Sequence, residues 1–152
     1  MQFDEIIFLE DMKEEDKLRL YVSDKGDYSF IQKYFEDKPE GVPHFFFNVT
    51  MQNHRGYTYA GDDFETTVQL VGELQGKYPE TEQYLSLMRE SDQALKKLLS
   101  FFEQYEEPVV LVLFSDHQPC LEDSFYQEIT GKAPGMWQLE ERMRQYKTPL
   151  LI

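Results

Sequence analysis

Residues 109–118 read VVLVLFSDHQ, so a wholly apolar run changes abruptly to polar side chains at Ser115. Six consecutive apolar residues are typical of a strand that is buried on both faces, as in a parallel sheet. A long pattern over residues 80–105 precedes this run, with apolar residues recurring at spacings of three and four. That spacing predicts an amphipathic helix, which Pro108 ends. The pattern therefore predicts a helix followed directly by a buried strand.

A second short apolar run, FFFNVT at residues 45–50, lies upstream of the same predicted helix. Strand, helix and strand in this order predict a β-α-β crossover in a largely parallel sheet. We therefore expect an α/β fold with a mixed, mostly parallel sheet and helices on both faces. Residues 45–50 and 109–114 are its expected central strands.

The remaining segments carry weaker signals. Residues 17–22 alternate between polar and apolar side chains and predict a short strand. Ser23, Asp24 and Asp27 offer helix-capping oxygens ahead of a helical pattern over 28–35, and Pro39, Gly41 and Pro43 form the loop that ends it. A short helix within 64–74 is also indicated. Residues 148–152 (TPLLI) predict the beginning of another buried strand.

Composition excludes several classes of protein. The chain of 152 residues is long enough for one α/β core. Its net charge of −14 at pH 7 argues against a nucleic-acid partner, because binding to phosphate backbones needs clustered Lys and Arg. No apolar run is long enough to span a membrane, and the first residues lack the pattern of a signal peptide. The single cysteine, Cys120, cannot form an internal disulfide.

Two polar clusters follow the predicted strands, where ligands collect in parallel α/β sheets. One is residues 50–54, which end in His54, and the other is Asp116 with His117. A carboxylate oxygen and an imidazole nitrogen together suit a divalent ion such as Mn²⁺ or Zn²⁺. From local sequence alone a second interpretation stays open, in which Asp116 caps a turn and His117 is a hydrogen-bonded loop residue. His54 and His44 alone indicate no site.

Four segments in series resemble the lipoteichoic acid synthase and phosphoglycerol transferase family, within the sulfatases and the alkaline phosphatase superfamily. PHFFFNVTMQNH at 43–54 is similar to the family pattern P-F-F-x-x-x-x-T-x-x-x-H and departs from it at His44. YLSLMRESDQAL at 84–95 resembles the helix Y-x-x-x-x-x-x-x-D-x-A-L. VLFSDHQP at 112–119 resembles the metal motif F-G-D-H-x-P, with Ser115 in place of glycine, and TPLLI resembles the strand T-P-x-x-I.

The resemblance implies a role for each matching residue. Asp116 and His117 match the metal-binding pair, and His54 matches a histidine that faces the substrate phosphate or sulfate. Asp92 is interpreted as structural, tying its helix to a neighbouring loop. The family's nucleophile, a Thr or a modified Cys or Ser, lies upstream of these motifs, and no segment here matches it. Neither Thr50 nor Cys120 inherits that role, so no catalytic residue is assigned.

The resemblance also implies the function of the whole protein. Residues 1–152 are expected to be the C-terminal portion of one sulfatase-like catalytic domain with a partial alkaline phosphatase-like fold, truncated at both ends. The parent would be a metal-dependent enzyme, with Mn, Zn, Ca and Mg not distinguished. It would transfer or hydrolyse a phosphate or sulfate ester, including lipid-linked or glycan-linked esters. The chain alone is expected to be inactive.

Location and a rival function complete these expectations. The parent is expected to be extracytoplasmic and anchored in the membrane through segments absent here, with no membrane contact from this chain. The rival is a non-catalytic binding or interaction domain whose acidic surface engages a partner and whose motifs are relics. An upstream nucleophile in the intact protein would favour the enzyme.

Overall fold

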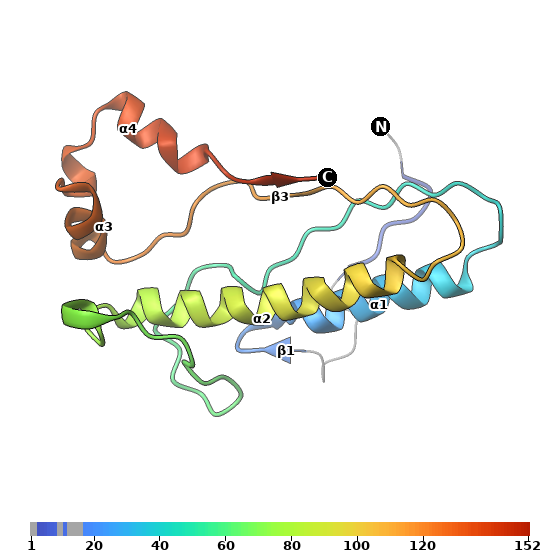
Figure 1. Ribbon diagram of the computed structural model, residues 1–152, viewed down its shortest axis with the longest axis horizontal. Helices are drawn as coiled ribbons and strands as arrows, with labels where there is room; N and C mark the ends of the chain where they lie inside the picture. The colour runs from blue at the N-terminus through green and yellow to red at the C-terminus, as the bar shows by residue number, and fades with distance from the viewer. Residues whose placement is uncertain (1–2, 9–10, 12–16) are drawn as a thin grey trace. The chain divides into compact units, whose positions relative to one another are not determined.

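The computed structural model of the chain describes residues 3–8, 11 and 17–152 and divides into two units (Figure 1). Both units are discontinuous in sequence, because the chain leaves each of them and returns to it. The first comprises Met1–Asn53, Ala60–Phe64 and Leu87–Glu107, and the second comprises His54–Tyr59, Glu65–Ser86 and Pro108–Ile152. The longest helix, α2 (Pro79–Phe102), therefore contributes its first turns to the second unit and its later turns to the first.

The first unit begins with a hairpin in place of the single strand predicted over 17–22. Strands β1 (Lys17–Leu18) and β2 (Tyr21–Val22) pair antiparallel through a turn at Arg19 and Leu20. Arg19 has a φ of 57°, which is uncommon for a residue other than glycine. Its backbone N–H donates to Asp63 Oδ2 at 2.9 Å, and its guanidinium donates to the backbone oxygen of Gln52 at 2.9 Å. These contacts stabilise the tight turn.

Helix α1 (Asp24–Asp37) confirms the predicted helix and extends it towards the N-terminus. Ser23 is the N-cap, and its hydroxyl accepts a hydrogen bond from the backbone N–H of Gly26 at 3.0 Å. The helix ends at Asp37, one residue before its C-cap Lys38. The predicted loop follows. Sequence capping signals therefore located both ends of this helix to within a few residues.

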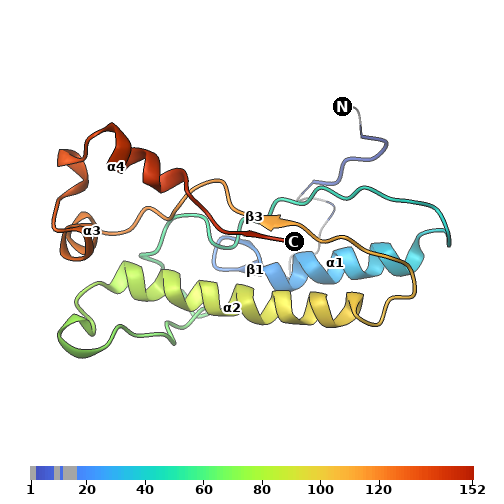
Figure 2. The same cartoon turned by 45° about the horizontal axis from the view of Figure 1, so that its top comes forward.

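Figure 2 shows α1 alongside the later turns of α2, and aromatic contacts join the two helices. The Phe35 and Phe102 rings meet edge to face with centroids 5.0 Å apart, and the Tyr105 hydroxyl donates to the Phe35 backbone oxygen at 3.0 Å. On α2 the buried apolar positions are Leu87, Ala94 and Leu98. The predicted helix is confirmed, but its buried face is rotated from the predicted one. Of the positions that recur at spacings of three and four, Leu98 alone is buried; these positions are Tyr84, Met88, Ser91, Leu95, Leu98 and Phe102.

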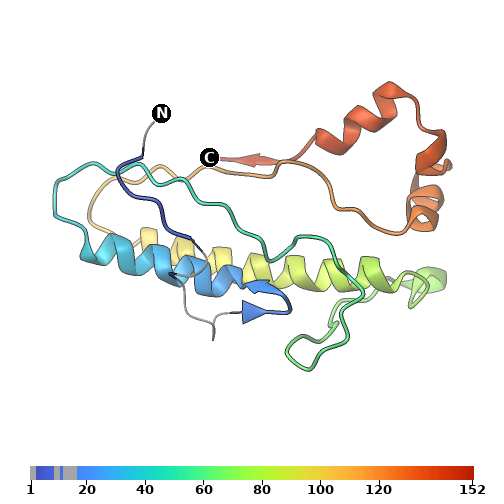
Figure 3. The same ribbon diagram turned by 180° about the vertical axis from the view of Figure 1, so that it is seen from behind.

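The second unit holds the first turns of α2, two short helices and one small sheet. Helices α3 (Asp123–Thr130) and α4 (Leu139–Met143) lead to the C-terminal strand β4 (Leu150–Leu151), as Figure 3 shows. Strand β3 (Leu113–Phe114) pairs antiparallel with β4. Short 3₁₀ turns occur at η3 (Gly72–Leu74), η4 (Pro134–Met136) and η5 (Arg144–Tyr146). Only η3 corresponds to the helix indicated within 64–74.

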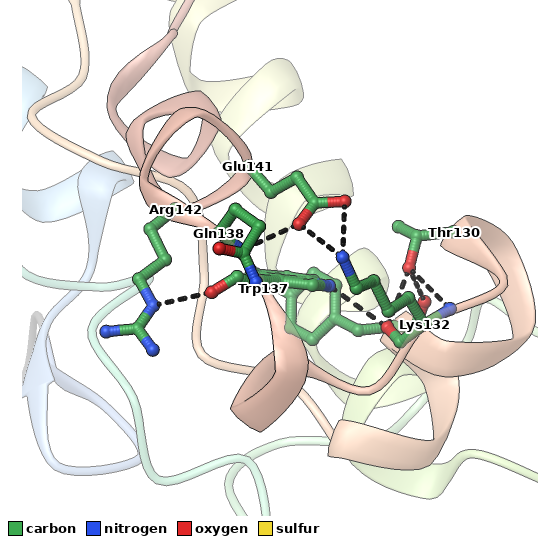
Figure 4. Close-up of polar contacts among 7 residues, drawn as sticks. Thr130, Lys132, Trp137, Gln138, Glu141 and Arg142 are labelled. Atoms are coloured by element: carbon green, nitrogen blue, oxygen red, sulfur yellow. Dashed lines mark hydrogen bonds and ion pairs between the residues drawn. The ribbon is translucent and has the colours of Figure 1, made fainter.

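A cluster of polar contacts fixes the connection between α3 and α4 (Figure 4). The Trp137 indole N–H donates to the Lys132 backbone oxygen at 3.0 Å, and the Lys132 ammonium pairs with Glu141 at 2.8 Å. Glu141 also accepts from the backbone N–H of Gln138, which completes a capping box at the start of α4. Arg142 Nε donates to the Trp137 backbone oxygen at 3.1 Å. The contacts are internal to this corner and explain its local order.

The predicted mostly parallel sheet is absent from the part of the chain that the structure describes. The described strands form two sheets, each of two antiparallel strands. Residues 45–50 form no strand, and only Leu113 and Phe114 of residues 109–114 do so. Apolar side chains in both runs remain open to solvent, with Phe45 70% and Val110 81% exposed. A parallel strand needs neighbours on its edges and helices over its faces. Among the described residues, Leu113 and Phe114 are the part of these runs that has a strand partner, and that partner, β4, is antiparallel.

The C-terminal strand also differs from the prediction in burial. Strand β4 confirms that residues 148–152 contain a strand, yet both Leu150 and Leu151 are more than half exposed. Among the described helices, none combines the length and the apolar character required to cross a bilayer.

Candidate functional site

Asp116 and His117 directly follow β3, as predicted, and both side chains are exposed. The backbone N–H of His117 donates to Asp116 Oδ1 at 2.8 Å, and the ring Nδ1 of His117 lies 2.8 Å from the backbone oxygen of Gln118. The Thr148 hydroxyl donates to the Ser115 backbone oxygen at 2.6 Å. The loop is thus held by its own hydrogen bonds and by a contact with the segment that leads to β4.

The hydrogen bond to Gln118 determines what the imidazole of His117 can do. A backbone oxygen only accepts hydrogen bonds, so Nδ1 must carry the proton, and a neutral ring then presents its lone pair at Nε2. Nε2 lies 3.4 Å from Asp116 Oδ2. Two ligand atoms that each lie about 2.0–2.2 Å from a tetrahedral ion are themselves about 3.4 Å apart. The two side chains therefore fit a shared divalent cation, and a protonated His117 would instead pair with Asp116.

The donor set at this loop is small. Within residues 3–8, 11 and 17–152, no three His, Cys, Asp or Glu side chains gather in a way that could hold a metal ion. Asp116 and His117 consequently offer two ligands of an incomplete set. Both interpretations drawn from the sequence stay open, because the pair makes local loop hydrogen bonds and also has Nε2 and Oδ2 3.4 Å apart.

His54 lies in an exposed bend immediately after an anchored turn. The Gln52 side chain is 1% exposed, and its oxygen accepts from the backbone N–H of Asp24 at 2.9 Å. Its amide nitrogen donates to the Leu87 backbone oxygen at 3.2 Å and to Ser91 Oγ at 3.0 Å. The two residues before His54 are thus fixed to the first unit, while His54 itself belongs to the second.

Ser91 connects this turn to α1. Its hydroxyl accepts from the side-chain amides of Gln52 at 3.0 Å and Asn53 at 2.7 Å, and donates to Asp24 Oδ2 at 2.5 Å. Asp24 is 2% exposed, and its second oxygen, Oδ1, has no hydrogen-bond partner among the described residues. Because this carboxyl group is buried, losing the hydrogen bond that Ser91 donates to it would lower the stability of the first unit.

Burial perturbs two carboxyl groups at the start of α1. Desolvation raises the pKa of Asp24, although hydrogen bonds from Ser91 and Thr50 act in the opposite direction. Desolvation also raises the pKa of Asp27 to about 6, against a hydrogen bond from Asn48 and with the negative charge of Asp24 adding to the rise. The first unit therefore contains two acids whose charged form is disfavoured by burial.

His54, Asp116 and His117 fall in the same unit. They do not form a three-ligand cluster, and their predicted placement on one crevice stays a prediction. Asp92, interpreted from the sequence as a structural residue, is exposed on α2. Cys120 is an exposed free cysteine.

Glu122 is a residue that sequence reasoning missed. Its carboxylate accepts from the backbone N–H groups of Glu80 at 2.7 Å and Thr81 at 3.0 Å, and from the Thr81 hydroxyl at 2.7 Å. A carboxylate satisfies the unpaired N–H groups at a helix N-terminus and also favours its positive end. Glu122 thereby attaches the segment that follows Asp116 and His117 to α2. No local signal reveals a cap supplied from 42 residues away.

We predict that Glu122→Ala lowers the free energy of unfolding by about 1–2 kcal/mol, because it removes the acceptor for two backbone N–H groups and one hydroxyl. Urea unfolding followed by circular dichroism measures the change. Glu103→Ala, at an exposed position just beyond the end of α2, is the control and should change little. Equal effects of the two substitutions would contradict the capping role of Glu122.

Comparison with known proteins places the chain in a family. Its whole length, residues 1–152, matches the Sulfatase family. It is 26% identical over 153 aligned residues to a protein of Rhizobium meliloti (strain 1021) provisionally named for cyclic beta-1,2-glucan modification, covering 94% of this chain and 22% of that protein. It is 31% identical over 102 residues to the capsular polysaccharide biosynthesis protein RkpI of the same organism, covering 67% of this chain and 17% of RkpI.

The chain thus spans about a fifth of the length of these curated relatives. No solved structure matches it. Sulfatase-family proteins carry an alkaline phosphatase-like α/β fold, which supports the predicted fold class, although the described strands form only two small antiparallel sheets. The motifs around His54 and Asp116 lie within the matched residues, and the chain belongs to the sulfatase family.

Proposed function

We propose that the chain is the C-terminal portion of the catalytic domain of a metal-dependent enzyme that transfers or hydrolyses a phosphate or sulfate ester. The enzyme would be of the phosphoglycerol transferase or sulfatase type. The observation that carries this proposal is the convergence of Asp116 Oδ2 and His117 Nε2 at 3.4 Å, with His117 Nδ1 directed at the Gln118 backbone oxygen. Family membership supplies the reaction class.

In this proposal Asp116 and His117 hold the ion, and the Gln118 backbone oxygen keeps His117 in the tautomer that leaves Nε2 available. When bound, a divalent ion polarises the ester and stabilises the negative charge that develops during its cleavage. His54 donates a hydrogen bond to an anionic oxygen of the same ester. The nucleophile comes from another part of the intact protein, because neither Thr50 nor Cys120 matches it. Mn, Zn, Ca and Mg all remain candidates for the ion.

The proposed substrate is an ester carried on a glycan. Both relatives have names that refer to a glucan or a polysaccharide, and this is the support for the substrate class. In a transferase the second acceptor would be a glycan or glycerol hydroxyl, and in a hydrolase it would be water. We also propose that the intact protein acts outside the cytoplasm and is anchored in the membrane through other segments. That part rests on the resemblance to phosphoglycerol transferases.

The role of His54 is tested in the intact protein with bis-p-nitrophenyl phosphate and p-nitrophenyl sulfate as probes. His54→Gln should lower kcat/KM for the active probe by about 10- to 100-fold, the range for losing a hydrogen bond to a charged group. His44→Gln is the matched control, because His44 is exposed and the resemblance assigns it no role. Unchanged kcat/KM in His54→Gln would exclude His54 from the site, and an intact protein inactive towards every phosphate and sulfate ester tried would overturn the proposed function.

The same assay applied to the chain of residues 1–152 should show no turnover, because the proposed site needs a nucleophile that this chain does not provide. Metal-dependent turnover by this chain alone would show that the nucleophile has been misplaced and lies among these residues.

A further inference from the structure

Ser91 connects several polar side chains of the first unit by hydrogen bonds. A serine hydroxyl can donate one hydrogen bond and accept two, and Ser91 makes all three. It donates to Asp24 Oδ2 at 2.5 Å and accepts from Gln52 at 3.0 Å and Asn53 at 2.7 Å. Ser91 thereby joins α2 to the first turn of α1 and to the irregular turn at residues 52–53.

The two amides that Ser91 accepts from belong to consecutive residues, and the next residue is His54. Gln52 is almost completely buried, and its remaining polar atoms bond to Asp24 and Leu87. His54 is exposed, but its backbone directly follows a residue that is fixed by hydrogen bonds. Exposed turns without side-chain hydrogen bonds to the rest of the protein are mobile. A mobile turn would not hold the imidazole of His54 in one orientation.

We propose that Ser91 is a positioning residue for His54, which it orients by clamping the side chains of Gln52 and Asn53. This inference rests on the proposed function, in which His54 contacts the anionic oxygens of a phosphate or sulfate ester. Ser91 does not touch the substrate. Asp24 supports this role because it accepts the hydrogen bond that the Ser91 hydroxyl donates. Both lone pairs of the Ser91 oxygen are then directed towards the amides of Gln52 and Asn53.

Ser86 provides a matched comparison on the same helix. It is fully buried, its hydroxyl donates to the Glu82 backbone oxygen, and it accepts from the backbone N–H groups of Thr67 and Val68 at 3.0 and 2.9 Å. Ser86 thus resembles Ser91 in hydrogen bonding, although Ser91 is only half-buried, and Ser86 holds a different loop. A loss of stability alone would follow either substitution, whereas a loss of His54 orientation should follow only Ser91→Ala.

The kinetic test is a double-mutant cycle in the intact protein, with bis-p-nitrophenyl phosphate and p-nitrophenyl sulfate as probes. Ser91→Ala should lower kcat/KM by about 10-fold in the native background and by less than about 2-fold when His54→Gln is already present. Ser91→Thr, which keeps the hydroxyl, should restore most of the activity. Ser86→Ala should show no coupling to His54. Equal effects of Ser91→Ala in both backgrounds would overturn the inference.

A second measurement on the chain of residues 1–152 does not depend on activity. Backbone ¹⁵N relaxation should give order parameters for residues 52–55 that are near 0.85 in the native chain and below about 0.6 in Ser91→Ala. In Ser86→Ala they should stay at the native value. Native-like order in Ser91→Ala would overturn the positioning role whatever the kinetics show. If His54→Gln leaves kcat/KM unchanged while Ser91→Ala still loosens the turn, the proposed role of His54 fails and the clamp remains.

Discussion

Replacing Asp116 or His117 by alanine in the intact protein is expected to lower kcat/KM for its ester substrate by at least about 100-fold. Residues that only orient metal ligands already contribute about 10- to 100-fold to affinity or activity, so a ligand itself should contribute at least as much. The two side chains are also expected to depend on one another, because the atoms proposed to bind the metal lie 3.4 Å apart. The double variant should therefore lose little more than either single variant.

Chelation and replacement of the metal separate this expectation from a loss of folding. Activity of the native protein should disappear with EDTA and return with added Mn²⁺, Zn²⁺, Ca²⁺ or Mg²⁺. In Asp116→Ala it should return only partly and at higher metal concentration. Asp62→Ala, which removes an exposed aspartate from a turn, is the control and should behave like the native protein. Full activity of Asp116→Ala in chelator would rule out its role as a metal ligand.

Helices were the most predictable elements, because their signals are local. The capping hydroxyl of Ser23 and the loop residues after Lys38 lie within a few residues of the ends they mark, and both ends of α1 follow from them. The apolar period over 80–105 likewise predicted α2. The face was rotated because Met88 and Leu87 are adjacent and both apolar, and only tertiary contacts select between them. In the structure Met88 is 41% exposed and Leu87 is fully buried.

Strands were less predictable, because a strand is defined by a partner that the local sequence does not contain. Residues 45–50 have the composition of a buried strand, yet the described residues offer them no strand to pair with. Strand β3 pairs antiparallel with β4, whose residues lie 36 to 38 positions further along the chain. Apolar composition reports a tendency towards burial and carries no information about strand direction.

Candidate site residues followed a similar rule. Asp116, His117 and His54 could be proposed because each lies in a motif whose residues are close in sequence. Ser91 and Glu122 could not, because their partners lie 38 to 67 and 41 to 42 residues away. In the sequence Ser91 is one position of the helical pattern over 80–105. The hydrogen bonds of its hydroxyl can be seen only when α1 and the turn at residues 52–53 are placed beside α2.

Lowering the pH from 7 to about 4 is expected to stabilise the first unit through Asp27. Its pKa in the folded chain is about 6, above the ordinary value of 3.8, because burial disfavours the charged form. Between these two values the folded state binds more protons than the unfolded state, so the free energy of unfolding falls as pH rises through this window. The difference between the two pKa values corresponds to about 3 kcal/mol, lost in full above pH 6. The pKa of Asp24 is also raised, so its contribution has the same sign.

Asp27→Asn should remove this pH dependence, because an amide is neutral at every pH and can still accept the hydrogen bond that Asn48 donates to Asp27. Urea unfolding at pH 5 and pH 7.5 should show the variant to be more stable than the native chain at pH 7.5, by up to about 3 kcal/mol, and by about half as much at pH 5. Asp37→Asn, at an exposed position in the last turn of α1, is the control for a change of charge alone. Half-buried carboxylates with lowered pKa, such as Glu107, act in the opposite direction in acid but are common to both chains. A native chain whose stability relative to Asp27→Asn is the same at both pH values would show that Asp27 is ionised in the fold without cost.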